Sequence, residues 1–456
     1  MQRIWRKASL VLLTCMLVFL AACGSSNSKS ENNASTGSAN TSTGSGASQE
    51  NASGSGGGPN AGSSGATKLT VAAESWMVEK LFVQQAVDKF NAAHPEYTVE
   101  LVPYADPTVL SSFALQWAKG ETDADVVIID GTSNAVQFMA RDLIINFNET
   151  NFFEGKTAKE NFVGNVLSFG AYNDFQFAIP FALEAYAFNA NKAMFADAGL
   201  TDANGNIIPP ANWEEVLEYA RKMHKDGKTG MTLQWGPNAL YTMIATEQAA
   251  RGSFYDDEGV LTFDTPEMRQ ILEIWKKGRD EGVFSIDTYT NKDAGRNNYK
   301  AGQVGILFES GSRAPEAAPT IGAENATVFG APGMETNGSF AFSAGIIVPR
   351  ASKAQDLAIK FIQEALMDEE VQANAASVWG KLPVIAEYFD KIDAEWKTTL
   401  YNIIEKSVTS PFYRDFPVIY KETPVLLQFY LNGELSLDDF IKQMEDMIAN
   451  AGKEIS

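Results

Sequence analysis

The amino-acid sequence predicts an α/β fold, in which short apolar strands alternate with amphipathic helices. A polar leader gives way to the apolar run Leu69 to Ala73, which has the length of a strand. Helical spacing of apolar residues follows at Phe82, Ala86 and Phe90, and a continuous apolar run covers Val126 to Ile129. Strand and helix in this order are typical of an α/β unit with a mostly parallel sheet between helices.

Three further strands are predicted from their residue patterns. Tyr97, Val99 and Leu101 alternate with polar residues, as in a strand with one covered face. The runs Met231 to Leu233 and Gly305 to Phe308 are short and largely apolar. Trp235 and Tyr241 flank a Gly-Pro-Asn turn after the first run, and Glu309, Ser310 and Arg313 follow the second. Such positions place polar side chains at the carboxyl ends of strands.

Several later helices are predicted from capping residues that precede an apolar helical face. A capping box places Ser, Thr, Asp or Asn three residues before Glu or Gln, and Pro is favoured at the first helical position. The signals are Asn212 with Glu215, Thr265 with Pro266, Ser352 with Gln355, and Ser436 ahead of Phe440.

The N-terminus has the features of a secretory signal peptide, residues 1–22. Basic residues precede an apolar run from Leu10 to Ala22, which is too short to span a bilayer well. The sequence Leu20-Ala21-Ala22-Cys23 resembles the bacterial lipobox, in which the cysteine is diacylated and becomes the mature N-terminus. An uncleaved helical anchor is the alternative, although it gives no reason for the cysteine. Both readings predict a cell-membrane protein whose body lies on the extracytoplasmic face.

Residues 23–66 are predicted to form a disordered tether, because Ser, Gly, Asn, Thr and Ala dominate them and bury little apolar surface. Cys15 lies within the signal, so the predicted mature chain has no pair of thiols for a disulfide. Stability must therefore come from apolar cores, which a chain that is 45% hydrophobic can form. The net charge of −21 disfavours nucleic acid as a partner.

Motifs along nearly the whole predicted mature body carry a family resemblance. The segment Ile179 to Asn189 is followed by Ala198-Gly199-Leu200 and by Pro210-Ala211-Asn212-Trp213-Glu214-Glu215. The elements Tyr299 to Ile306 and Gly380-Lys381-Leu382-Pro383 come later, in the same order as in the family. Together they resemble the extracellular solute-binding proteins of family 1, the sugar-binding lipoproteins of ABC transporters, which are similar in organisation to maltose-binding protein.

The resemblance implies a two-lobed fold of the periplasmic-binding-protein kind (type II), each lobe a mostly parallel sheet flanked by helices. The N-terminal lobe is expected at 67–182 plus 336–378, and the C-terminal lobe at 183–335 plus 379–456. The lobes would close on a small solute, expected to be a mono- or oligosaccharide, and present it to ABC permease subunits. The resemblance further implies a monomer without a cofactor, which meets the membrane only through the lipid on Cys23.

Candidate ligand residues are polar or aromatic side chains near the ends of predicted strands and in the matched segments. Carboxylates and amides pair with the hydroxyls of a sugar, and aromatic rings cover its C–H faces. The resemblance implies a ligand-binding residue at the position of Glu184. The candidates are Glu74, Trp76, Asp130, Glu184, Tyr186, Trp235, Tyr241, Glu309, Ser310, Arg313, Ser343 and Trp379.

Structural roles compete with these assignments. Trp213 and Trp275 lie on apolar helical faces, so core packing is expected for both. A strand-end Asp130 can equally cap the next helix. Replacing Glu184 by Ala is predicted to abolish ligand binding at little cost in stability.

Two other functions are open from the sequence, namely a surface-anchored carbohydrate-active enzyme and a ligand sensor for a receptor or kinase. A glycosidase needs two carboxylates about 5–10 Å apart, which a chain with 57 acidic residues satisfies by chance. With His94 and His224 as the two histidines and an acylated cysteine, the sequence supports no catalytic residue and no metal site. We therefore expect a binding protein and not an enzyme.

Overall fold

The computed structural model describes residues 67–105, 108–285, 288–413 and 416–451. The predicted signal peptide, the lipid site at Cys23 and the tether therefore lie outside the described residues. Within the described ranges, no helix combines the length and the apolar character that crossing a membrane requires.

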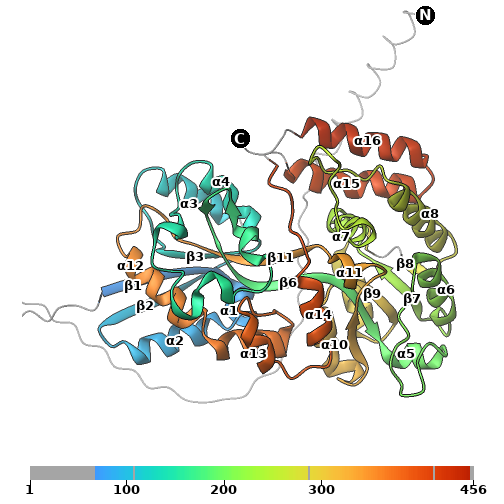
Figure 1. Ribbon diagram of the computed structural model, residues 1–456, viewed down its shortest axis with the longest axis horizontal. Helices are drawn as coiled ribbons and strands as arrows, with labels where there is room; N and C mark the ends of the chain where they lie inside the picture. The colour runs from blue at the N-terminus through green and yellow to red at the C-terminus, as the bar shows by residue number, and fades with distance from the viewer. Residues whose placement is uncertain (1–66, 106–107, 286–287, 414–415, 452–456) are drawn as a thin grey trace, which may run out of the picture. The chain divides into compact units, whose positions relative to one another are not determined.

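The first half of the main sheet is built on β1 (Thr67–Glu74). This strand pairs in parallel with β2 (Tyr97–Tyr104) and β3 (Val126–Ile129), as the apolar runs predict. Next comes β11 (Ala341–Ile347), which is antiparallel to β3. The helices of this half are α1 (Ser75–Lys80), α2 (Val83–Ala93), α3 (Val109–Trp117), α4 (Val136–Met139), α12 (Gln355–Phe361) and α13 (Glu369–Trp379) (Figure 1).

The second half of the sheet contains β7 (Thr229–Leu233), β8 (Phe284–Ser285), β9 (Val304–Ser310) and β10 (Ala326–Phe329). In it, β7 runs parallel to both β8 and β9. A separate two-stranded hairpin joins β4 (Ala171–Tyr172) to β5 (Phe175–Gln176). The remaining helices are α5 (Lys192–Asp197), α6 (Trp213–Met223), α7 (Ala239–Arg251), α8 (Pro266–Asp280), α9 (Lys292–Lys300), α10 (Arg313–Ile321), α11 (Met334–Asn337), α14 (Lys397–Ile404), α15 (Phe416–Leu431) and α16 (Leu437–Asn450).

One long strand, β6 (Ile179–Asn191), belongs to both halves of the sheet. Its first part pairs with β11, and its second part pairs with β9 and β10. The chain meets β6 again at Leu382, whose backbone exchanges hydrogen bonds of 2.8 and 3.0 Å with Leu183. Figure 1 shows β6 and β11 running through the middle of the molecule, with helices of the two halves on either side.

The capping signals are confirmed at three helices and wrong at one. The side chains of Asn212, Thr265 and Ser436 each accept a backbone N–H at the start of a helix, at 2.9, 3.1 and 3.1 Å. The Ser352 hydroxyl donates to the Asp125 carboxylate at 2.7 Å and accepts the backbone N–H of Ala354 at 3.1 Å, whereas α12 begins at Gln355 with Ala354 as its N-cap residue. Ser352 therefore binds the turn before the helix and does not cap the helix itself.

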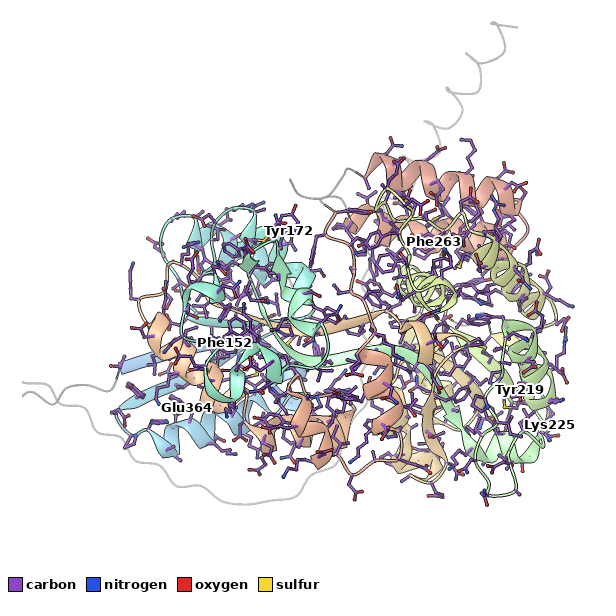
Figure 2. The ribbon with its side chains drawn as sticks, in the orientation of Figure 1. Phe152, Tyr172, Tyr219, Lys225, Phe263 and Glu364 are labelled. Atoms are coloured by element: carbon purple, nitrogen blue, oxygen red, sulfur yellow. The ribbon has the colours of Figure 1, made fainter. Side chains whose placement is uncertain are left out.

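Buried side chains fill both halves of the molecule (Figure 2), and Phe152 and Phe263 are fully buried in the first and second half respectively. Trp213 and Trp275 are buried with ring centroids 5.7 Å apart, which confirms the expected core packing. The two halves of the sheet are thus held by extensive apolar contacts, and these contacts fix the loops at the strand ends.

Candidate functional site

A cavity of about 610 Å³ opens where side chains from both halves of the sheet converge. Its volume lies in the range typical of small-molecule sites. The residues that line it are Trp76, Lys80, Asp130, Gly131, Thr132, Ser133, Asn134, Glu184, Tyr186, Asn238, Tyr241, Arg296, Glu309, Arg313, Phe340, Phe342, Lys381, Thr409, Ser410, Phe416, Pro417 and Tyr420.

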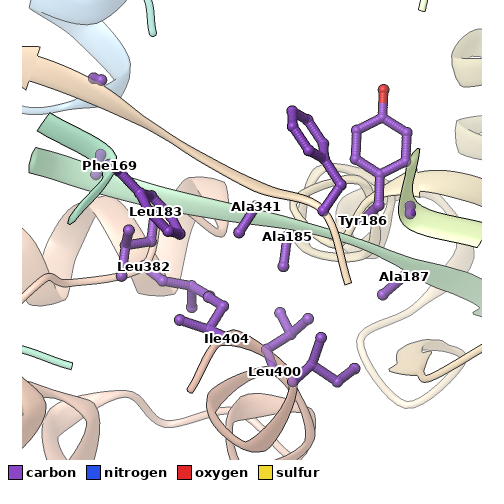
Figure 3. Packing of buried hydrophobic residues seen from close by; sticks show 14 of the residues in the cluster. Phe169, Leu183, Ala185, Tyr186, Ala187, Ala341, Leu382, Leu400 and Ile404 are labelled. Carbon is purple, nitrogen blue, oxygen red and sulfur yellow. The ribbon is translucent and has the colours of Figure 1, made fainter. Parts of the chain in front are cut away.

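Strand alternation on β6 decides which of its side chains reach the cavity. Glu184 and Tyr186 are two residues apart, so they point to the same face and both line the cavity. Ala185 and Ala187 point to the opposite face, where α14 covers β6 (Figure 3). The matched segment thus supplies a carboxylate and a phenol from one strand.

Glu184 is the centre of a buried polar cluster. Its carboxylate lies 2.5 Å from the ammonium of Lys381, and side chains at both positions are almost fully buried. The hydroxyls of Ser310 and Ser312 donate to Oε2 of the same carboxylate at 2.6 and 2.9 Å. Every partner of Glu184 therefore stabilises its charged form.

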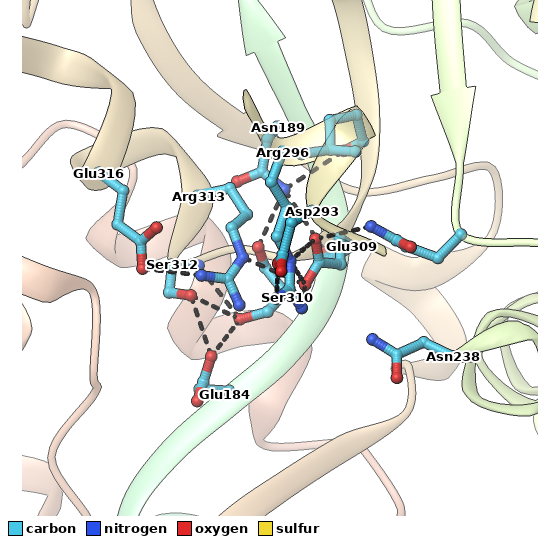
Figure 4. Close-up of polar contacts among 12 residues, drawn as sticks. Glu184, Asn189, Asn238, Asp293, Arg296, Glu309, Ser310, Ser312, Arg313 and Glu316 are labelled. Carbon is cyan, nitrogen blue, oxygen red and sulfur yellow. Dashed lines mark hydrogen bonds and ion pairs between the residues drawn. The ribbon is translucent and has the colours of Figure 1, made fainter. Parts of the chain in front are cut away.

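A second carboxylate, Glu309 on β9, is held between two arginines (Figure 4). Arg296 on α9 binds both of its oxygens, and Nε of Arg313 donates to Oε1 at 3.1 Å. The amide of Gln234 donates to Oε2 at 3.1 Å. The network continues through Nη1 of Arg313, which donates to Glu316 at 2.7 Å.

The pKa values of these buried acids are lowered. Burial alone would raise the pKa of Glu184, but the charges of Lys381 and Arg313 and the hydrogen bonds from Lys381 and Ser310 lower it to about 2. Burial likewise opposes ionisation of Glu309, and Arg313 and Arg296 lower its pKa. Burial lowers the pKa of Lys381 against the effect of Glu184, yet the 2.5 Å contact and the acidic Glu184 favour the charged pair.

We expect the stability of the protein to fall in acid partly because of Glu184. Its contribution is fully present above the unfolded-state pKa of about 4.5 and is lost as the pH falls through the folded-state pKa of about 2. Urea midpoints measured at several pH values between 5 and 2 test this. The variant Glu184→Gln should show a shallower decline over that interval, and an identical slope in both proteins would contradict the assignment.

Aromatic rings form another wall of the cavity. The rings of Tyr241 and Phe340 are stacked, with centroids 4.6 Å apart and planes 11° apart, and Tyr420 lies 5.0 Å from Tyr241. Phe342 continues the stack at 5.9 Å from Phe340. Trp76 is a further aromatic residue of the lining, and the ammonium of Lys381 lies over its ring, 5.3 Å from the ring centroid. These surfaces can contact the apolar faces of a ligand.

The loop after β3 closes a further side of the cavity with polar groups. Asp130 directly follows β3 and is exposed, Gly131 comes next with φ of +82°, and a 3-10 turn covers Thr132–Ala135. Burial and then the Asp130 carboxylate raise the pKa of Tyr420, which places this negative charge near the aromatic wall. Asp130 therefore contributes to the cavity lining, and Gly131 is the N-cap residue of the following 3-10 turn.

The structure brings together a large part of the candidate set. The predicted site residues that line the cavity are Trp76, Asp130, Glu184, Tyr186, Tyr241, Glu309 and Arg313. Glu309 lies within β9 and Arg313 begins α10, so strand β9 extends two residues beyond the predicted Phe308. Polar residues near predicted strand ends therefore line the cavity, although the predicted end of β9 lies two residues too early.

The other candidates lie outside the cavity lining. The Ser310 hydroxyl donates to the Glu184 carboxylate, and the Ser343 hydroxyl accepts hydrogen bonds from the backbone N–H groups of Phe181 and Ala182. The remaining three are Glu74 at the end of β1, Trp379 under the ammonium of Lys80, and Trp235, which is fully buried beside Trp275. A position after a strand does not reveal whether an indole turns inward to the core.

Several lining residues were missed by the sequence analysis. Lys381 lies in the family-like segment Gly380-Lys381-Leu382-Pro383, and a charged residue between apolar neighbours could have marked it as a candidate. Arg296 lies on a polar helix, and Phe416 and Tyr420 lie far along the chain on α15. No local pattern marks these three, because only the fold brings α9 and α15 to the cavity.

Comparison with known proteins places this cavity in context. The family model of the bacterial extracellular solute-binding proteins matches residues 85–400. A protein of Brucella abortus that is named as a binding protein is 24% identical over 344 residues, which cover 72% of this chain and 78% of that protein. A protein of Brucella suis with the same kind of name matches equally well.

Solved structures show the same architecture. The GacH receptor of Streptomyces glaucescens, studied unliganded and with acarbose, gives a TM-score of 0.72 at 18% identity, over 86% of this chain and 100% of that one. A maltose-bound protein of T. maritima gives 0.69 at 18% identity, over 84% and 100%. A mannitol-bound solute-binding protein of Agrobacterium vitis gives 0.63 at 18%, over 84% and 98%. These likenesses confirm the predicted α/β fold of the periplasmic-binding-protein kind.

Proposed function

Because the chain belongs to the bacterial extracellular solute-binding protein family, we propose that it captures a mono- or oligosaccharide and delivers it to an ABC permease. Its family consists of binding proteins, so the chain is a binding protein and not an enzyme. The acidic residues of the cavity are accordingly ligand-contacting or structural groups.

The composition of the cavity carries this proposal. A carbohydrate has hydroxyls around its rim and C–H groups on its faces, so it needs polar groups and aromatic rings in one site. The Tyr241 and Phe340 stack and the Trp76 ring supply the rings, while Asp130 and Asn238 supply polar atoms. The acarbose, maltose and mannitol of the structural neighbours are ligands of this chemical class, which supports the same class here.

The proposed capture mechanism is closure of two lobes, with boundaries at 67–182 plus 336–378 and at 183–335 plus 379–456. The continuity of β6 and the backbone pairing of Leu183 with Leu382 support hinges near these positions. A ligand that contacts both halves would favour the closed form, because it binds that form more tightly. The permease would then recognise the closed form.

We also propose that the protein is a monomer held at the extracytoplasmic face of the cell membrane by a lipid on Cys23. The lipobox-like sequence and the polar segment that follows it support this arrangement. The tether would let the folded body stay near a membrane permease.

Thermal-shift and calorimetric titrations with a panel of sugars test the function. A true ligand at a hundredfold excess over its Kd should stabilise the protein by about 2.7 kcal/mol. Trp76→Ala should weaken binding of that ligand by roughly 10- to 100-fold, because an aromatic platform is lost, and should change the unfolding free energy little. Trp379→Ala is the matched control, since Trp379 also lies under a lysine but outside the cavity.

Trp379→Ala should leave the Kd within about threefold of the unchanged protein. Equal losses of affinity in the two variants would argue against the cavity as the binding site. The absence of binding by every sugar in the panel would refute the proposed class of solute.

A further inference from the structure

We propose that the cavity binds its sugar through an anionic substituent, a carboxylate or a phosphate, which lies against Arg313, Arg296 and Lys381. This inference rests on the proposed function and narrows the class of solute to acidic carbohydrates. The charged wall of the cavity, formed by Lys80, Glu184, Arg296, Glu309, Arg313 and Lys381, has hydrogen-bonding groups that remain open to a ligand.

The carboxylates on this wall have little accepting capacity left for a ligand. Lys381 binds one oxygen of Glu184, and two serine hydroxyls bind the other. Arg296 and Arg313 bind Oε1 of Glu309, while Arg296 and Gln234 bind its Oε2. Because a carboxylate offers about four lone-pair positions, protein donors occupy most of them already.

The cations on the same wall have donors to spare. A guanidinium carries five N–H donors, and Arg313 uses Nε for Glu309 and Nη1 for Glu316. Its Nη2 has no hydrogen-bond acceptor among the described residues, although the side chain is only 11% exposed. The ammonium of Lys381 has three donors, and Glu184 accepts one hydrogen bond from it. The wall therefore presents donors and lacks acceptors.

The formal charges of the lining also favour an anionic group of the ligand. Lys80, Arg296, Arg313 and Lys381 line the cavity. Glu184 and Glu309 face them, and Glu316 lies behind Arg313, where Lys80 reaches it at 3.1 Å. Asp293 and Lys300, which pair with Arg296 and Glu316 outside the cavity lining, have opposite charges and offset each other. Around Arg313 the cations therefore exceed the carboxylates by one charge, and Asp130 supplies the balancing charge elsewhere in the lining.

Hydroxyl-bearing parts of the ligand would face the rest of the cavity. Tyr186 is 2% exposed, lines the cavity, and its hydroxyl has no hydrogen-bond partner among the described residues. The Asp130 carboxylate lies near Tyr241 and Tyr420, where it can accept hydroxyl protons. The hydroxyl oxygens of a neutral sugar can accept hydrogen bonds from the guanidinium groups, but these bonds lack the acceptor charge that makes a bond between a guanidinium and an anion stronger. An acidic sugar satisfies both sides and has one preferred orientation.

Calorimetric titration of the full chain with matched ligands tests the proposal. Each set contains a neutral sugar, its uronate and its phosphate ester, with acetate and inorganic phosphate as the free anions. We expect a uronate or a phosphate ester to bind roughly 10- to 100-fold more tightly than its neutral counterpart, as charge-assisted hydrogen bonds predict. Its Kd should also rise with salt, because the attraction between charges is screened.

The variant Arg296→Gln should remove most of that preference, since it removes one guanidinium while Arg313 and Gln234 still hold Glu309. We expect a loss of about tenfold or more for the acidic ligand and less than about threefold for the neutral one. Arg221→Gln is the control, because Arg221 makes a comparable two-pronged contact with Glu281 on the surface. It should leave both affinities unchanged.

The outcomes separate this inference from the proposed function. Neutral sugars that bind as tightly as their acidic counterparts would overturn the anionic subsite and leave sugar binding intact. Free acetate or phosphate that binds as tightly as the acidic sugar would overturn the assignment to a carbohydrate acid. Failure of every ligand would overturn both proposals, whereas preference by the uronate or by the ester identifies which anion the site takes.

Discussion

Glu184→Ala should destabilise the folded protein by about 3–5 kcal/mol, measured by urea unfolding at neutral pH. The substitution leaves the ammonium of Lys381 almost fully buried without its anionic partner, 2.5 Å away in the native protein. It also removes the acceptor of the Ser310 and Ser312 hydroxyls. Sequence alone predicted a small effect on stability, and the buried ion pair reverses that expectation.

A double-mutant cycle separates the ion pair from simple loss of volume. Glu184→Leu combined with Lys381→Met replaces both charges by apolar groups, so the double variant should be less destabilised than the sum of the single variants. A coupling energy near zero would show that the two side chains do not stabilise each other. Glu184→Gln keeps the size and shape of the side chain, so the ligand affinity of its folded fraction then reports on the role of the Glu184 charge in binding.

Trp235→Ala should also cost about 3–5 kcal/mol, because it opens a cavity in the core of the second half. Trp235 is fully buried and lies 5.8 Å from Tyr289 and 6.4 Å from Trp275, between ring centroids. It does not line the cavity, so ligand affinity of the folded fraction should change by less than about threefold. Urea unfolding and calorimetry on the same preparation measure the two effects.

Trp235→Phe is the informative control for that substitution. The indole N–H of Trp235 has no hydrogen-bond acceptor among the described residues, so its removal sacrifices no hydrogen bond. We expect a loss below about 1.5 kcal/mol, since most of the aromatic volume is kept. A large loss of ligand affinity in either variant, with stability unchanged, would restore the sequence-based assignment of Trp235 to the site.

Much of the fold could be predicted because its signals are local. The buried strand Val126–Ile129 is apolar throughout, and the Asn212 cap lies three residues before the N–H that it accepts. No strand was predicted at Ile179–Asn191, and only the observed β6 puts Glu184 and Tyr186 on one face through the alternation of a strand. Ser352 shows the limit, since its hydroxyl binds Asp125, a residue far away in the sequence.

The sequence by itself determined the α/β fold and the family, because periodicity, capping and motif order are properties of neighbouring residues. It also predicted the strand ends near which the cavity lies. Only the tertiary structure decided which charges meet. Glu184 and Lys381, or Arg296 and Glu309, are separated along the chain and come together through the packing of β6, β9 and α9. The same packing turned Trp235 into the core and Trp76 toward the cavity, since the direction of a side chain depends on what surrounds it.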